Sequence, residues 1–108
     1  MKNIEMKYKL AIMQCVYQMI ASSDGAVVGW RDNEAINYLM TQLGLTSNFS
    51  WNAAINLNPH ESFKLVGELD TFNQIQVRDL LYKISNMGGN TVYRKNCAQQ
   101  IMQFAGWK

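Results

Sequence analysis

The chain has 108 residues, of which 48% are hydrophobic and 17% are charged. This composition is typical of one globular domain and excludes an intrinsically disordered chain. The formal net charge is only +2, and the ten Lys and Arg residues are scattered, which argues against a nucleic-acid-binding face. We therefore expect a single domain over residues 1–108 that has no nucleic-acid partner.

Apolar residues at helical spacing predict a first helix that ends near Ser22. Its apolar surface is wide, which indicates a helix buried in the centre of a bundle. This surface contains Met6, Leu10, Ile12, Met13, Val16, Tyr17, Met19 and Ile20. A loop over 23–29 follows, and we expect a second helix over roughly 31–43 with Gly44 as its C-terminal stop.

Capping signals predict two short helices in the middle of the chain. Thr46 and Ser47 can cap a short helix that extends through Ile55. Asn58 followed by Pro59 is a strong start signal for the next one, because Asn accepts from a free backbone N–H and Pro suits the first turn.

The last third of the sequence predicts two longer helices. Asp70 or Thr71 can cap the first of them, which ends before the glycines at 88–89. The second is expected over roughly 92–104, and Gly106 closes it.

Short loops joining amphipathic helices predict an all-α fold, an antiparallel bundle of about five to six helices. No stretch shows strand alternation flanked by turn residues. The stretches 20–28 and 84–92 resemble each other, which suggests two pseudo-repeated helix–loop–helix halves; the alternative is a chance match.

Carboxylates gather only around the first loop, at Asp24, Asp32 and Glu34. Oxygen ligands of this kind suit calcium or magnesium, so these three residues are candidate metal ligands. The alternative is structural: Asp24-Gly25 makes a turn, and the two later acids favour the positive end of the second helix.

The other chemically active residues do not form a recognisable catalytic set, so we expect no enzymatic activity. His60 follows Pro59 at a helix start and is interpreted as a surface residue. Cys15 and Cys97 are not a Cys-x-x-Cys pair and are interpreted as buried thiols. The basic patches Lys2/Lys7/Lys9 and Arg94/Lys95 are interpreted as solvated faces.

Three aromatic residues outside the predicted helix centres are candidates for a partner surface. They are Trp30 in the first loop, Tyr93 at the start of the last helix and Trp107 at the tail. If they are exposed together they would bind a protein or a second copy of the chain. The alternative is that each ring closes one end of the core.

The first apolar stretch, residues 10–20, is interrupted by Gln14 and Gln18 and has no cleavage pattern of small residues. We therefore expect no membrane insertion and a cytoplasmic protein.

The run from Met19 to Gly44, with an Asp-Gly loop between an apolar helix and a glutamate-containing helix start, resembles the TerB-like domain of bacterial tellurite resistance. That domain is also similar to the N-terminal region of the co-chaperone DjlA. The later runs 65–69, 80–84 and 101–102 resemble the second half of the family. The resemblance implies a helical bundle with two related halves and a cation held by loop acids, here Asp24 and Glu34.

The second loop departs from the family pattern. Gly88 and Asn96 stand where the family repeats the aspartate and the glutamate. The resemblance therefore carries an acidic site only to the first loop. We expect a non-catalytic, stress- or tellurite-related bacterial domain that binds a divalent cation there. The alternative is a protein–protein interaction module without a metal.

Overall fold

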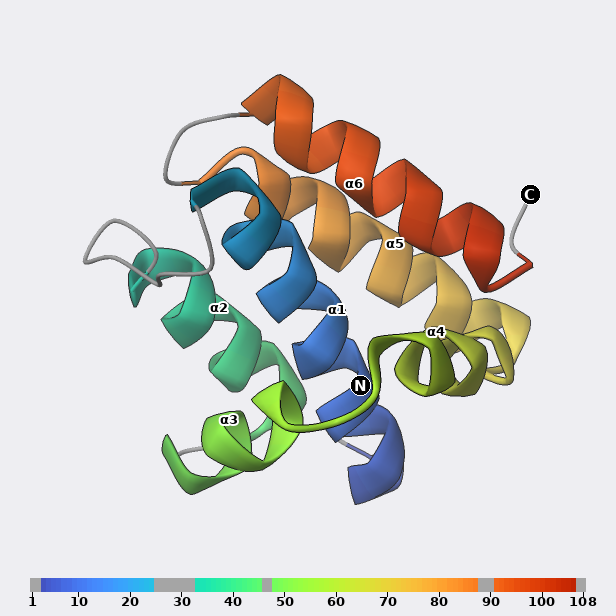
Figure 1. Cartoon of the computed structure of the whole chain (residues 1–108). Helices are drawn as coiled ribbons and strands as arrows, with labels where there is room; N and C mark the ends of the chain where they lie inside the picture. Colours follow the sequence, from blue (N-terminus) through green and yellow to red (C-terminus); the bar gives the residue numbers. More distant parts are fainter. Residues whose placement is uncertain (1–2, 25–32, 46–47, 88–90, 107–108) are drawn as a thin grey trace.

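The computed structural model describes residues 3–24, 33–45, 48–87 and 91–106, and six α-helices make up most of them (Figure 1). The helices are α1 (Met6–Asp24), α2 (Asn33–Leu43), α3 (Asn48–Ile55), α4 (Pro59–Gly67), α5 (Thr71–Ser85) and α6 (Thr91–Phe104). The predicted all-α fold is confirmed for the described residues. Helix α1 extends to Asp24, two residues beyond the predicted end.

Helix α1 lies in the middle of the molecule, with α2 on one side, α5 and α6 on the other, and the short helices α3 and α4 near its N-terminal end (Figure 1). Its most extensive contacts are with α4, followed by α3 and α6. Six consecutive residues of α1, from Ala11 to Val16, are fully buried. The wide apolar surface predicted for this helix is therefore a consequence of neighbours on several sides.

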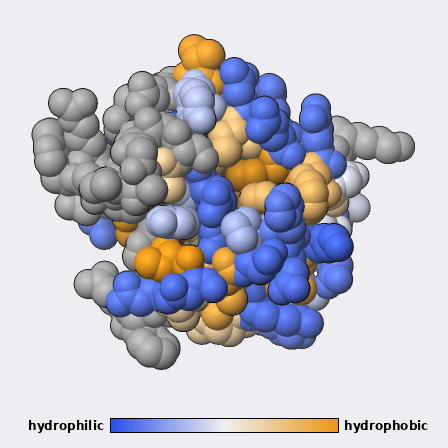
Figure 2. Space-filling model, in the orientation of Figure 1, coloured by the Kyte–Doolittle hydropathy of each residue, from blue (hydrophilic) through white to orange (hydrophobic). Residues whose placement is uncertain are grey.

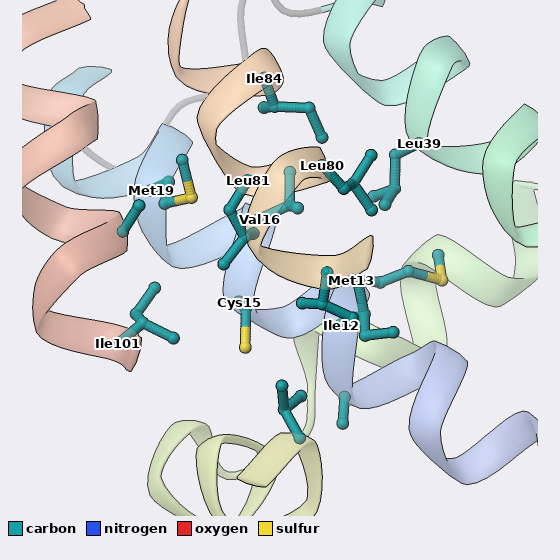
Figure 3. Close-up of a cluster of buried hydrophobic side chains, with 14 of the residues drawn as sticks. Ile12, Met13, Cys15, Val16, Met19, Leu39, Leu80, Leu81, Ile84 and Ile101 are labelled. Atoms are coloured by element: carbon teal, nitrogen blue, oxygen red, sulfur yellow. The ribbon is translucent and has the colours of Figure 1, made fainter. Parts of the chain in front are cut away.

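The hydrophobic core joins α1 to α2, α5 and α6. Figure 3 shows Met13 and Val16 of α1 close to Leu80 and Leu81 of α5, with Leu39 of α2 at one side of the cluster. These side chains are at most 3% exposed. Burial of such apolar area is the main favourable term in folding, at roughly 25 cal/mol per Å².

The helix caps predicted at Asn58 and Asp70 are present in the structure, whereas Thr46 and Ser47, predicted to cap α3, lie outside the described residues. The side chain of Asn58 accepts a hydrogen bond from the backbone N–H of Glu61 at 3.0 Å, and Pro59 occupies the first turn of α4. At α5 the cap is Asp70, whose carboxylate accepts from the N–H of Asn73 at 2.9 Å. Gly44 follows α2 with a φ of 70°, a conformation that glycine adopts without steric cost.

A buried amide of α1 fixes the link between α3 and α4. Gln14 is fully buried, and its Nε2 donates to the carbonyl of Ala54 at 2.7 Å and to that of Leu57 at 3.0 Å. Its Oε1 accepts from Gln18 Nε2 at 2.8 Å. The buried amide is therefore hydrogen-bonded through both its nitrogen and its oxygen, as a polar group in a core must be.

The two predicted helix–loop–helix halves have the same order of elements but pack differently. Helix α5 lies directly against α6, whereas the most extensive contacts of α1 are with α4 and those of α2 are with α5. In Figure 1 the C-terminal ends of α1 and α5 lie at the same end of the molecule. In the described residues, no helix has the length and apolar character needed to cross a bilayer.

Candidate functional site

The acidic residues predicted as metal ligands lie at the edges of the described structure. Asp24 is the last residue of α1, and its side chain lies outside the described part, as does the whole of Asp32. Glu34 is exposed in the first turn of α2, where its charge favours the helix dipole. No group of three or more His, Cys, Asp or Glu side chains that could hold a metal occurs among the described residues.

Of the three aromatic residues predicted as a partner surface, only Tyr93 is described. Its side chain is 53% exposed, and the preceding Val92 is 75% exposed. Trp30 and Trp107 lie outside the described residues. Of this predicted surface, the described residues therefore show only an exposed apolar pair at the start of α6.

The outer face of α6 has a simple chemical pattern. Four of its exposed residues follow one another at intervals of four: Val92, Asn96, Gln100 and Phe104. Such residues lie in one row along a helix surface. The row is apolar at both ends and carries amides in the middle. Figure 2 shows hydrophobic atoms at the N-terminal end of α6 and polar side chains along the rest of it.

Charge is nearly absent from this face. Helix α6 contains no Asp or Glu, and Lys95 is its only exposed charged residue. The exposed amides of Gln99 and Gln103 lie beside the row and extend its uncharged surface. Depletion of charge combined with exposed aromatic rings is typical of the centre of a protein interface.

The C-terminal end of the row is supported by an aromatic cluster. The ring of Phe104 lies 4.8 Å from that of His60 and 5.5 Å from that of Phe63, both on α4. The Phe63 contact is edge-to-face, a favourable geometry for aromatic pairs. Phe104 nevertheless stays 47% exposed, so its ring has a fixed position and a free face. His60 is exposed, as its position after Pro59 predicted.

The interpretation of Arg94/Lys95 as a solvated patch is wrong for Arg94. Its side chain is fully buried, and Nη1 donates to the carbonyl of Met87, just past the end of α5, at 2.6 Å. It takes part in a further interaction as well. The helix period explains the difference, because residue 94 shares the inward row of α6 with Ala98 and Met102. Lys9, from the other patch, is also buried.

The two cysteines are free thiols, as expected, but only Cys15 is fully buried. Burial strongly raises the pKa of the Cys15 thiol, and the nearby Cys97 adds to the rise. Burial also raises the pKa of Cys97, which is half-buried. A raised pKa keeps a thiol protonated at neutral pH, so neither thiol is activated as a nucleophile.

A polar groove of about 610 Å³ lies between α2 and α5. Its lining residues are Asn3, Tyr38, Gln42, Gln76, Asp79, Leu80 and Lys83. The Nζ of Lys83 lies 4.9 Å from the centre of the Tyr38 ring, so these two lining residues form a cation–π contact with each other.

No family model, curated protein or solved structure matches the chain. The resemblance to TerB-like domains therefore stays a prediction that rests on the runs of residues given above.

Proposed function

We propose that this chain is a cytoplasmic, non-catalytic protein-interaction domain of TerB-like type, and that the outer face of α6 is its binding surface. The observation that carries the proposal is the exposure of Val92, Tyr93 and Phe104 on one helix at 75%, 53% and 47%. Side chains of this size and apolarity make a favourable contribution to the free energy of binding when a partner removes them from water.

The position of α6 supports the same proposal. The helix packs on α5, α1 and α4 through its inner row, and its outer face points away from the bundle (Figure 1). Because Arg94 and Met102 anchor the inner row, the exposed residues are held on a rigid element. A rigid face with a single charge and with rings near its ends loses little conformational entropy on binding.

Photo-crosslinking in cells tests this function. A benzophenone amino acid placed at Tyr93 is expected to give a discrete crosslinked protein band, because this position lies on the binding face. The same group at Met6, which is 49% exposed on α1, serves as the control and is expected to give none. The band at position 93 should disappear when Val92 is replaced by Glu.

The proposal is wrong if no crosslink forms at position 93. It is also wrong if the band survives the Val92→Glu change or appears equally at position 6.

We also propose that the first loop binds a divalent cation, in a stress- or tellurite-related context. The support is the family resemblance together with the placement of Asp24 at the end of α1 and Glu34 at the start of α2, on the two sides of one loop. Isothermal titration with calcium and magnesium should show heat that the Asp24→Asn/Glu34→Gln variant loses. No heat with either ion would contradict this proposal.

A further inference from the structure

The exposed row of α6 reads almost the same in both directions along the helix. Its order is apolar, amide, amide, apolar, at Val92, Asn96, Gln100 and Phe104. The centre of the row is at residue 98, so Val92 and Phe104 are equally distant from it, and so are Asn96 and Gln100. At a rise of 1.5 Å per residue the row is about 18 Å long.

From this symmetry we infer that the occupant of the α6 face is a second copy of this chain. The two α6 helices lie antiparallel about a two-fold axis that passes between Asn96 and Gln100, at the height of residue 98 along the helix. This inference rests on the proposed function of that face. The axis places Val92 against Phe104 of the second copy, and Asn96 against Gln100 of the second copy. Each apolar end then meets an apolar end, as a two-fold interface requires of one surface that binds itself.

The amides in the middle suit this arrangement because a carboxamide both donates and accepts hydrogen bonds. Asn96 and Gln100 are exposed and can pair with each other across the axis without any third group. A face made only of donors or only of acceptors could not bind its own copy in this way.

Charge also favours a second copy over a strongly charged partner. The outer face of α6 carries no carboxylate and only one exposed cation, Lys95. The axis relates Lys95 to a position near residue 101 of the second copy, so the two lysines do not meet. Self-association therefore brings no pair of like charges together at the centre of the interface.

Sedimentation velocity tests the inference at two protein concentrations, about 10 μM and about 500 μM. A weak dimer with a Kd between these values is mostly dissociated at the lower one and mostly formed at the higher one. The mass of the wild-type protein should rise toward twice the 12.4 kDa of one chain at the higher concentration. The control variant is Met6→Glu, because Met6 on α1 is about as exposed as Phe104 but lies off the α6 face. This change should leave the rise in mass as it is in the wild type.

Two double variants test the antiparallel register. Asn96→Glu/Gln100→Glu places carboxylates opposite carboxylates and should weaken the dimer at least about tenfold, or about 1.4 kcal/mol. Asn96→Glu/Gln100→Lys places opposite charges across the axis in the antiparallel pair and should keep the dimer. Both changes are at exposed positions, and circular dichroism would verify that α6 still folds.

The inference is overturned if the wild-type protein has the mass of one chain at both concentrations. It is also overturned if the Glu/Glu variant dimerises like the wild type, or if the Glu/Lys variant is weakened as much as the Glu/Glu variant. A monomer that still gives a crosslink at Tyr93 to another protein would refute the second copy as occupant and leave the proposed interaction function standing.

Discussion

Two neighbouring residues of α6, Arg94 and Lys95, have the same charge and opposite environments. Arg94 is fully buried and donates to the carbonyl of Met87, whereas Lys95 is exposed. A count of basic residues cannot separate them, because the separation comes from the helix period and not from composition. The sequence shows only that Arg94 is four residues before Ala98 and eight before Met102, which are apolar; the structure shows that both are buried.

Replacing these two residues by alanine should therefore have very different effects on stability. Arg94→Ala leaves the Met87 carbonyl without its charged donor and opens a cavity, so we expect a loss of about 2–3 kcal/mol. Lys95→Ala should change the free energy of unfolding by no more than about 0.5 kcal/mol. Urea denaturation measures both values, and equal losses would contradict the burial of Arg94.

The Cys15 thiol should make stability depend on pH in the alkaline range. Its pKa is raised in the folded protein by burial and by Cys97, whereas the pKa of a thiol in an unfolded chain is about 8.5. The folded state therefore holds the proton that the unfolded state loses. This contribution is fully present below about pH 8.5 and decreases above it, by up to about 1.4 kcal/mol per pH unit.

The matched measurement is urea unfolding of the wild type and of Cys15→Ala at pH 7, 9 and 10, with a reductant present. The variant should lose less stability between pH 7 and pH 10 than the wild type does. Identical pH profiles would show that Cys15 is not protonated in the folded state over this range.

Among the elements, those with explicit local signals were predicted well from the sequence. Asn58 and Asp70 cap α4 and α5 through their side chains, and Gly44 ends α2 in a left-handed conformation. These signals act within a few residues, so they can be read without the tertiary structure. The end of α1 was placed two residues too early, because no such signal marks it.

Contacts between elements were not predictable in the same way. Gln14 reads as an interruption of an apolar stretch, yet it is fully buried and holds the α3–α4 link. Of the residues on the outer face of α6, only Tyr93 was named from the sequence as a candidate for partner binding. The side of a helix that faces solvent depends on which elements pack against its other side. The side chains of Asp24 and Asp32, predicted as metal ligands, lie outside the described residues.

The end of α4 packs closely against the chain just past the end of α6. A Cβ at Gly67 would overlap the backbone carbonyl of Ala105, so alanine cannot be accommodated without moving one helix. Gly67→Ala should lower the free energy of unfolding by about 1–3 kcal/mol. Glu68→Ala, at the adjacent exposed position, should have little effect in the same thermal or urea assay.

If Gly67→Ala were as stable as the wild type, the α4–α6 approach would be looser than described. The position of Phe104, which contacts His60 and Phe63 on α4, would then also be less fixed.

In the bundle as a whole, a buried centre contributes stability, and the proposed binding face lies at the edge. Helix α1 is surrounded by its neighbours and contributes the buried stretch 11–16, so its sequence is constrained by packing. Helix α6 lies at the edge of the bundle (Figure 1). One row of its residues is buried and another is exposed. The inner row provides stability, and the outer row of Val92, Asn96, Gln100 and Phe104 is the exposed surface that we propose as the binding face.

The most direct test of this account is a ¹H–¹⁵N correlation spectrum recorded at low and at high protein concentration. Binding of a second copy through the outer face of α6 predicts shift changes that grow with concentration and are concentrated at Val92, Tyr93, Asn96, Gln100 and Phe104, with few changes in α1–α3. Spectra that do not change with concentration, or changes that cluster along the polar groove between α2 and α5, would contradict it.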